Sequence, residues 1–251
     1  MIDDVTPALA APSEMPSTTH EDHRPRVAAE RRQRMRSRLV ESAMVVFAQK
    51  GIGASVIQDV VAAAEVSQGS FYNYFRTNEE LLTAVGEDLS DEMVRLIETV
   101  VGDIDDPALR VATAVRSYLH IVRTYRVVAS FLSSAGLRLT GKESAVAAHL
   151  PSDLAEGLKR GRFEVPSLDV AVDVIGGAGM MAIHRMASGR TPKDYPEQVT
   201  LALLRALGLN AKTAAALVAT PIPKLAAPAD SLLARAQVRH AASATKPVAS
   251  S

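Results

Sequence analysis

The sequence predicts an all-α protein, and three observations carry this prediction. Apolar residues recur at three- and four-residue spacing along most of the chain, and no strand-like alternation of apolar and polar residues interrupts them. Glycine and proline stand between the periodic segments, where helices begin and end. The chain has no cysteine, which excludes disulfides and cysteine metal sites and suits a reducing compartment.

The first predicted helix ends at Gly51 and follows a segment of unusual charge. Its apolar stripe consists of Leu39, Ala43, Val46 and Phe47. Upstream, residues 24–38 carry seven arginines against one glutamate, whereas residues 1–22 carry five acidic residues and no basic one. We expect residues 1–23 to be a disordered acidic tail. The arginine segment is either an arm that contacts nucleic-acid phosphates or a solvated extension of the helix.

Two short helices follow, joined by a turn of three residues. Ser55 begins the first of them in a capping box with Gln58. Its apolar positions recur at helical spacing: Ile57, Val60, Val61 and Ala64. We expect the turn to need no positive φ at Glu65, and Ser67 to cap the second helix by accepting from the backbone N–H of Ser70. This arrangement is a helix-turn-helix, in which the second helix enters the major groove of DNA.

The second short helix has an apolar face and a polar one. Phe71 and Phe75 share one face and should be buried in a core common to the three small helices. The other faces are polar and uncharged: Gln68, Ser70, Tyr72, Asn73 and Tyr74. Amides at the start of a helix suit base edges, hydroxyls reach phosphates, and Gly69 lets the backbone approach a phosphate. Alternatively, the two tyrosines are half-buried core residues with hydrated hydroxyls.

The order of these residues resembles the N-terminal domain of the TetR family of bacterial transcription regulators. The matching positions are Leu39, Ala43, Val46, Phe47, Gly51, Ser55, Val60, Val61, Ala64, Glu65, Val66, Ser67, Gly69, Phe71, Tyr72, Tyr74, Phe75, Asn78, Glu79 and Leu81. Three positions depart from the family pattern: Val61 replaces alanine, Glu65 replaces glycine, and Asn78 replaces a lysine that touches phosphate. We therefore expect the DNA-binding residues to be Ser55, Ser67, Gln68, Gly69, Ser70, Tyr72, Asn73, Tyr74, Asn78 and Arg36.

The remainder of the chain predicts further helices. Thr77 caps a long helix that continues to about Val100, and Asp106 with Pro107 begins the next one. Later segments are expected at 126–138, 143–161, 167–188, 193–207 and 210–219, and residues 226–251 are expected to be disordered. The domains are accordingly 24–80 for DNA binding, with the basic arm, and 81–225 for effector binding and dimerisation.

The segment 167–188 is apolar on all sides and rich in small residues. Gly176, Gly177 and Gly179 would weaken a solvent-exposed helix by about 1 kcal/mol each relative to alanine, so we expect the helix to be buried on both sides. With the segment 193–207 and its Val199, Leu203, Leu204 and Leu207, it resembles the four-helix dimer interface of the TetR family. The alternative is a central helix of a monomeric bundle.

Candidate effector-binding residues lie on this segment and on the helix after Pro107. Asp173, Met180 and His184 fall on one stripe with Gly177. Asp173 is either a ligand group in a cavity or the partner of a cation such as Arg116 or Arg123, and a structural ion pair is the commoner use of such a residue. His120 is expected at the surface rather than in a binding site.

Several function classes are not supported by the sequence. The six histidines show no metal spacing, and there is no phosphate-binding glycine loop, so we expect no metal, no cofactor and no enzymatic activity. The longest uncharged apolar run, residues 174–183, is too short to span a bilayer, and no secretory signal is visible, so we expect a cytoplasmic protein. The leading hypothesis is a homodimeric repressor that a small-molecule effector releases from double-stranded operator DNA. The alternative is an architectural or partner-regulated DNA-binding protein without an effector.

Overall fold

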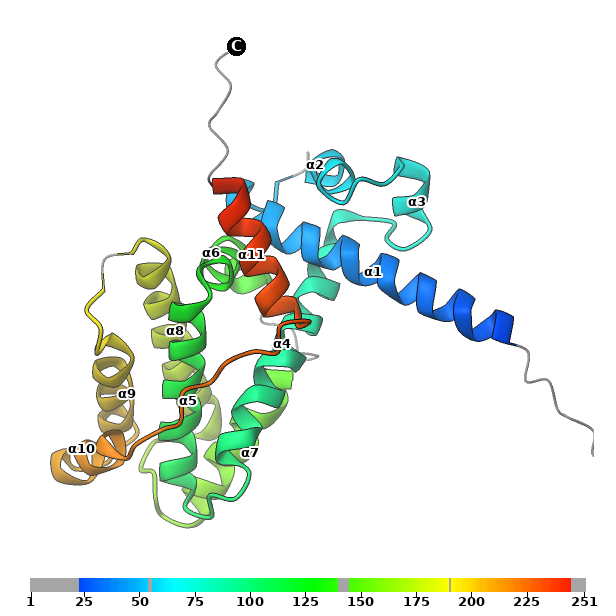
Figure 1. Ribbon diagram of the computed structural model, residues 1–251. Coiled ribbons are helices and arrows are strands. Elements are labelled where there is room, and N and C mark those ends of the chain that lie inside the picture. The colour runs from blue at the N-terminus through cyan, green and yellow to red at the C-terminus, as the bar shows by residue number, and fades with distance from the viewer. Residues whose placement is uncertain (1–22, 54–55, 140–144, 190, 245–251) are drawn as a thin grey trace, which may run out of the picture. The chain divides into compact units, whose positions relative to one another are not determined.

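The computed structural model describes residues 23–53, 56–139, 145–189 and 191–244. Within these ranges the regular structure is helical throughout, so the predicted all-α class is confirmed (Figure 1). The chain divides into two compact units, residues 1–34 and 35–251, and each is considered by itself. Ser55, predicted as a cap and as a DNA contact, lies outside the described residues, as does the acidic segment 1–22.

Eleven α-helices and one 3₁₀ helix make up the described part of the chain. They are α1 (His23–Lys50), α2 (Val56–Ala63), α3 (Gln68–Tyr72), α4 (Asn78–Val101), α5 (Pro107–Thr124), α6 (Arg126–Ala135), η1 (Gly136–Leu139), α7 (Ala145–Lys159), α8 (Leu168–Ala187), α9 (Tyr195–Ala206), α10 (Ala211–Ala219) and α11 (Leu232–Ala244). We call residues 35–77 the head and residues 78–220 the helical domain.

Local capping explains where several helices begin. Thr77 accepts from the backbone N–H of Glu80 at 3.0 Å and starts α4, as predicted. Asp106 accepts from the N–H of Ala108 and starts α5, where Pro107 occupies a position that needs no N–H donor. Asn210 accepts from the N–H of Thr213 at 2.8 Å and starts α10. These helix starts therefore follow from residues adjacent in the sequence.

The buried apolar side chains form two clusters in the second unit. The larger cluster joins α1, α2 and α3 to α4, to parts of α5, α6 and α8, and to α11, so the head shares its core with the helical domain. The rings of Phe47 on α1 and Phe131 on α6 lie 6.2 Å apart within it. The smaller cluster joins the first half of α5 to α7, α8, α9 and α10. The three small helices share one core, as predicted, and that core extends into the helical domain.

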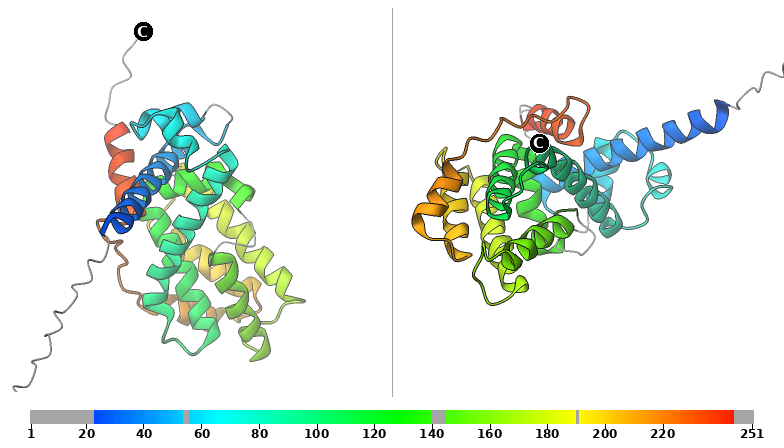
Figure 2. Two further views of the ribbon diagram at one scale, coloured as in Figure 1. Left: turned by 90° about the vertical axis from the view of Figure 1, so that its right-hand side faces the viewer. Right: turned by 90° about the horizontal axis from the view of Figure 1, so that it is seen from below.

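The prediction that residues 226–251 are disordered is wrong for the part that forms α11. This helix packs against α4 and α6 (Figures 1 and 2). Leu233 and Ala236 are completely buried, and Leu232 nearly so. The surrounding alanines, serines and prolines gave this segment the composition of a disordered tail, and its short apolar stripe was overlooked.

Candidate DNA interface and effector site

The turn between α2 and α3 requires a left-handed residue. The N–H of Val66 donates to the carbonyl of Val61, and the N–H of Glu65 donates to that of Ala62, each at 3.1 Å. This pair of bonds is a Schellman motif, whose left-handed position is usually glycine. Here Glu65 occupies it with a φ of 50°. Our expectation that this turn needs no positive φ was wrong, and a side chain is held there at a cost of about 1–2 kcal/mol.

α3 is fixed by its first residue and by two aromatic rings. Ser67 accepts from the backbone N–H of Ser70 at 3.1 Å, as predicted. Phe71 and Phe75 are buried, also as predicted, and their ring centroids lie 6.1 Å apart. α3 is shorter than expected, because Asn73 is its C-cap and Tyr74 follows the helix.

The side of α3 opposite the phenylalanines is open to solvent. Gln68, Gly69 and Asn73 are exposed, and Tyr72 keeps 47% of its surface accessible while its ring stands edge-on to that of Phe71. A Cβ added at Gly69 would meet nothing within 4 Å, so another molecule can approach this backbone closely. Amides, hydroxyls and accessible backbone therefore gather on one uncharged surface.

Besides Ser67 and Ser70, which bond to each other, three predicted DNA-contact residues are held by other parts of the protein. The Asn78 amide points to the carbonyls of Ile52 and Gly53, with both nitrogen–oxygen distances at 3.4 Å, so it steadies the loop after α1. Arg36 donates to Asp88 on α4 at 2.6 Å and is half-buried. Tyr74 is half-buried and packs on the larger core, which is the alternative considered for it. The structure thus leaves the residues from Gln68 to Asn73 as the freest part of the predicted site.

The arginine segment is helical, because α1 begins at His23. In the first unit Glu30 accepts from Arg26 at 3.1 Å and from Arg34 at 3.4 Å, and these ion pairs are exposed. In the second unit Arg38 reaches Glu65 at 2.9 Å. Exposed pairs of this kind hold side chains weakly, so the arginines remain accessible to phosphates.

The predicted effector residues on α5 belong to a half-buried polar network. Arg116, only 6% exposed, donates to the carbonyl of Thr220 at 2.8 Å and lies 3.6 Å from the Glu197 carboxylate. Glu197 also contacts the Nε2 atom of His120 at 2.7 Å, and Arg123 contacts the Nδ1 atom at 3.0 Å. His120 is therefore partly exposed and links a charged residue of α9 to one of α5.

The balance of charge in this network favours an ionised Glu197. Burial raises the pKa of its carboxyl, but the hydrogen bond from His120, a backbone hydrogen bond and the positive charge of Arg116 outweigh burial and leave the pKa below its usual value. Sequence reasoning missed Glu197 because it lies in the first turn of α9, where an acidic residue is explained by the helix dipole alone.

Several buried atoms of this region have no hydrogen-bond partner within the protein. They are the Arg116 Nε, Ser117 Oγ, Arg123 Nη1 and Glu197 Oε2 atoms. Buried polar groups normally find partners, so such a group of orphans indicates a place where water or a ligand supplies them.

The predicted effector residues on α8 lie elsewhere. Asp173 and His184 are exposed and Met180 is partly exposed, and His184 contacts the Ser133 hydroxyl at 2.9 Å. The pairing of Asp173 with Arg116 or Arg123 is not formed. Arg116 contacts Thr220 and Glu197, and Arg123 contacts His120 on its own helix. The five predicted residues therefore do not line one cavity.

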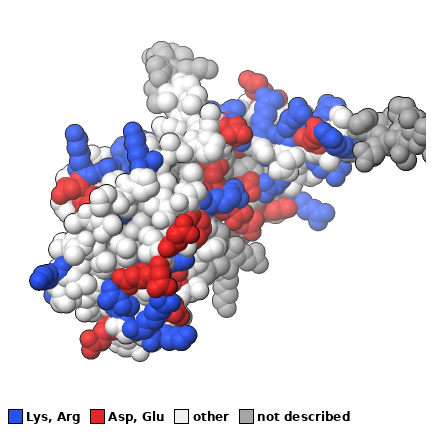
Figure 3. Space-filling model, turned by 60° about the horizontal axis from the view of Figure 1, so that its bottom comes forward, with Lys and Arg blue, Asp and Glu red and all other residues white. Residues whose placement is uncertain are grey.

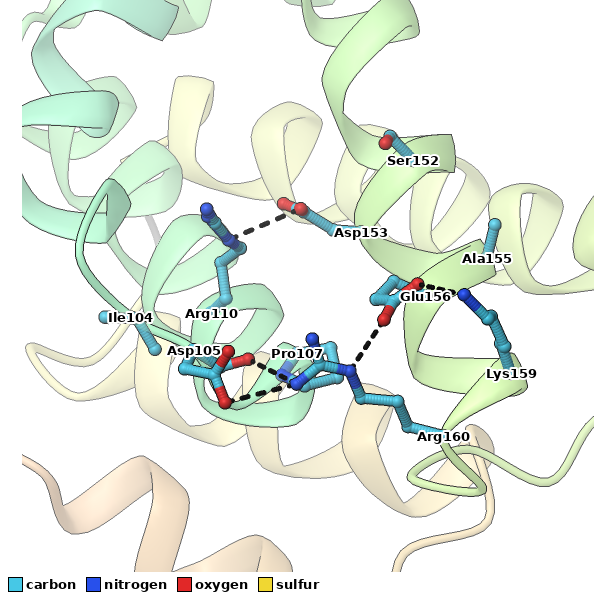
Figure 4. A pocket seen from close by; sticks show the side chains of 10 residues that line it. All are labelled: Ile104, Asp105, Pro107, Arg110, Ser152, Asp153, Ala155, Glu156, Lys159 and Arg160. Carbon is cyan, nitrogen blue, oxygen red and sulfur yellow. Dashed lines mark hydrogen bonds and ion pairs between the residues drawn. The ribbon is translucent and has the colours of Figure 1, made fainter.

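A hollow of about 460 Å³ opens between the start of α5 and α7 (Figure 4). Its charged side chains pair across it: Arg110 with Asp153 at 3.4 Å, and Arg160 with Asp105 at 3.2 Å. Burial raises the pKa of Asp153, and Arg110 lowers it by a smaller amount. None of the predicted effector residues lines this hollow.

Charged residues of both signs also stand side by side on the face drawn in Figure 3.

Comparison with known proteins follows the division between head and helical domain. Residues 39–85 match the family model for bacterial regulatory proteins of the tetR family, and residues 106–220 match the model for the tetracyclin repressor-like C-terminal domain. The chain is 37% identical over 76 residues to the HTH-type transcriptional repressor DhaR of Mycobacterium sp. (strain GP1), covering 30% of this chain and 38% of DhaR. It is 27% identical over 97 residues to the repressor KstR2 of Rhodococcus jostii (strain RHA1), covering 38% and 48% of the two chains. The chain thus spans less than half the length of these curated relatives.

Solved structures extend the similarity over most of the chain. The crystal structure of RolR in complex with resorcinol has 28% sequence identity and a TM-score of 0.60, and covers 79% of this chain and 100% of that one. FadR of Bacillus subtilis in complex with stearoyl-CoA has 18% identity and a TM-score of 0.56, which shows the fold alone. Among the residues that the structure describes, no group of three or more histidines, cysteines and carboxylates could hold a metal ion.

The helix-turn-helix and the two matched domains are those of DNA-binding transcription regulators. The chain belongs to the TetR family of bacterial regulatory proteins.

Proposed function

We propose that this protein is a cytoplasmic homodimeric repressor that binds a pseudo-palindromic operator and is released by a small molecule. The observation that carries this proposal is the exposed polar surface of α3. The buried Phe71 and Phe75 fix its orientation towards solvent. Gln68 and Asn73 suit base edges in the major groove, whereas Tyr72 and the Gly69 backbone suit phosphates. The arginines of α1 supply attraction that does not depend on sequence.

The proposed dimer uses the exposed side of α8. Val170 is 40% exposed and Met181 55%, and Cβ atoms added at Gly176, Gly177 or Gly179 would meet nothing within 4 Å. By length and composition α8 is also the one described helix that could cross a membrane, but in a family of DNA-binding regulators an apolar open face suits a second copy better.

The part of α9 that joins this surface differs from our prediction. Val199, Leu203, Leu204 and Leu207 pack inside their own chain, within the smaller core cluster. Leu201, Ala202 and Ala206 are the apolar residues of α9 that remain exposed, and they replace those four in the proposed interface.

The effector is proposed to bind in the helical domain near the α5 and α9 network. The orphaned atoms of Arg116, Arg123 and Glu197 offer donors and an acceptor to a ligand with several hydrogen-bonding groups. RolR, which shares the fold and 28% identity, was crystallised with resorcinol, a small hydroxylated aromatic. A small hydroxylated aromatic is therefore our first candidate for the effector.

Operator binding is tested by selecting from a random duplex library with the full chain. We expect a motif with two related half-sites and, by analytical ultracentrifugation, two protein chains per duplex. A chain that stays monomeric at micromolar concentration, both alone and with the selected duplex, would contradict the dimer. A chain that selects no motif would contradict sequence-specific binding.

Gly177→Leu tests the dimer surface separately. The added side chain has open space within one chain, so the fold should be kept, whereas it should separate two copies that meet at α8. The matched control is Ala215→Leu on the exposed side of α10. We expect the first variant to sediment as a monomer and to lose operator affinity, while the control behaves as the parent.

Effector release is tested by fluorescence anisotropy of the operator complex. We expect resorcinol or another small hydroxylated aromatic to lower the anisotropy, and Arg123→Gln to require a higher concentration for the same fall. If no member of a panel of hydroxylated aromatics and aromatic acids releases the DNA or raises the melting temperature, effector control by this class is wrong.

A further inference from the structure

α11 lies beyond both matched domains, which end at residues 85 and 220, yet it is built into the core. Leu233 and Ala236 have no accessible surface, and Leu232 has 7%. This burial anchors the helix between the head and the helical domain, and its polar side chains then reach in both directions.

On the side of the head, α11 neutralises a buried carboxylate. Glu41 on α1 is 8% exposed and accepts from Arg235 Nε at 3.0 Å and from Arg239 Nε at 2.8 Å. Arg239 Nη1 also donates to the carbonyl of Ala63, the last residue of α2, at 2.9 Å. A helix end leaves carbonyls without partners and favours a cation, so Arg239 completes the cap of α2.

On the side of the helical domain, a side chain of α4 caps α11, and a side chain of α11 caps α6. The Glu92 carboxylate of α4 accepts from the N–H groups of Leu232 at 2.8 Å and Leu233 at 3.0 Å, which caps α11 itself. The Gln237 amide oxygen accepts from the N–H of Val127 at 3.1 Å, in the first turn of α6. Tyr125, the residue before α6, provides no side-chain cap, so Gln237 fills that role from a distant part of the chain.

We propose that α11 is an intramolecular clamp that holds the head at one orientation on the helical domain and thereby prepares α3 for DNA. Its partners lie on α1, α2, α4 and α6, while Gln68, Tyr72 and Asn73 remain exposed, so the clamp and DNA do not compete for the same residues. A head that is already fixed loses less conformational freedom when it binds, and its affinity is correspondingly higher. The clamp goes beyond the proposed repressor function, although its affinity measurement rests on that function.

Two variants with opposite charge changes separate the clamp from simple electrostatics. Glu41→Gln removes a negative charge, and the double variant Arg235→Gln with Arg239→Gln removes two positive charges. If charge alone governed DNA affinity, the first would strengthen binding and the second would weaken it. The clamp predicts that both weaken binding to the selected operator by about fivefold or more, the lower end of typical coupling between sites. Both should leave the preferred base sequence unchanged.

The matched control is Lys212→Gln with Lys224→Gln, which removes two exposed positive charges away from α11. Hydrogen exchange provides a measurement that needs no DNA: amides of residues 39–75 should exchange faster in both clamp variants than in the control. Circular dichroism confirms that each variant is folded, and a chain ending at residue 228 gives the complete loss of the clamp.

The outcomes distinguish this proposal from the proposed function. If the parent selects no operator but the clamp variants speed exchange in the head, the repressor function fails and the clamp stands. If all folded variants bind operator like the parent, the clamp does not prepare α3 and is wrong. Tighter binding by both variants would also contradict the proposal, because it would show that α11 opposes DNA binding.

Discussion

α3 and α5 each carry a row of polar side chains, but the two rows differ in what they already bind. On α3 the exposed residues make only short local contacts, such as that between Ser67 and Ser70. On α5, Arg116 and Arg123 are tied to groups of α9, α10 and His120. A partner of α3 therefore finds its surface ready, whereas a ligand of α5 must exchange or rearrange existing contacts. Such a rearrangement is what a regulator needs in order to convert ligand binding into a change of shape.

Arg116→Gln should have the largest effect and tests whether the α5 row is structural. Arg116 is buried, and its loss leaves the Thr220 carbonyl and the partly exposed Glu197 carboxylate with one partner fewer each, so we expect the free energy of unfolding to fall by about 2 kcal/mol. Gln68→Ala on α3, by contrast, should change it by less than about 0.5 kcal/mol. Urea unfolding followed by circular dichroism compares the two variants. Equal stabilities would remove the distinction between the rows.

Deletion of residues 1–34 tests whether α3 acts with the arginine segment. Each phosphate contact adds about 0.9 to the slope of log affinity against log salt concentration, and five arginines are removed, so the slope should flatten by several units per dimer. Base preference should survive. Deletion of residues 1–22, which are acidic, should instead raise affinity slightly. Anisotropy across a salt series measures both, and an unchanged slope in the longer deletion would reduce the segment to a solvated helix extension.

Tyr72→Phe tests whether a single exposed hydroxyl of the α3 surface contacts a DNA phosphate. Loss of an exposed hydroxyl should weaken binding to all sequences by about 1 kcal/mol through a lost phosphate contact, without loss of stability. Tyr74→Phe, at a half-buried position, should weaken it less. Asn73→Ala or Gln68→Ala should instead change the preferred bases. Library selection with both alanine variants would refute base reading if the motif stayed the same.

Glu65→Gly tests the strained turn that positions α3. Glycine accepts a φ of 50° freely, so the free energy of unfolding should rise by about 1 kcal/mol, less the small contribution of the exposed pair with Arg38. Glu65→Gln removes the same ion pair but keeps the strain, and should be slightly less stable than the parent. Thermal unfolding of the three proteins provides the measurement. A loss of stability in the glycine variant would show that the ion pair outweighs the strain.

His240 should give the smallest effect and concerns the clamp rather than either row. Burial, and then the charge of Arg126, hold the pKa of its imidazole below the usual value of 6.5. The unfolded chain therefore takes up this proton more readily, and stability falls as the pH drops through 6.5 towards the folded pKa. Urea unfolding between pH 7.5 and 5.5 should show a smaller fall for His240→Gln than for the parent, with equal falls as the contrary result.

The features that could be predicted from the sequence are mostly those that depend on residues close together in the chain. Ser67, Thr77, Asp106 and Asn210 cap helices through residues two or three positions away, and their roles could be derived from the sequence. Phe71 and Phe75 could be assigned to the core because helical spacing places them on one face. The polar face of α3 follows from the same spacing.

Two of the wrong predictions concern contacts between distant residues, and a third concerns a local turn. Nothing near Asp173 in the sequence reveals that Arg116 is already occupied by Thr220, 104 positions away. α11 was overlooked because its apolar stripe is short and its polar partners lie on four other helices. The φ of Glu65 follows from the two hydrogen bonds of the turn, which a glutamate at this position does not reveal in the sequence.

The clamp also sets an order of events during synthesis. Glu41 leaves the ribosome 194 residues before Arg235, an interval of about 10–40 s at about 5–20 residues per second. Throughout that time the head has its aromatic core residues and its turn, but its buried carboxylate lacks both arginines and the last carbonyl of α2 lacks its donor. The nascent head is accordingly less stable than the finished one. A newly made chain thus acquires a fixed DNA-reading surface only after α11 has been synthesised.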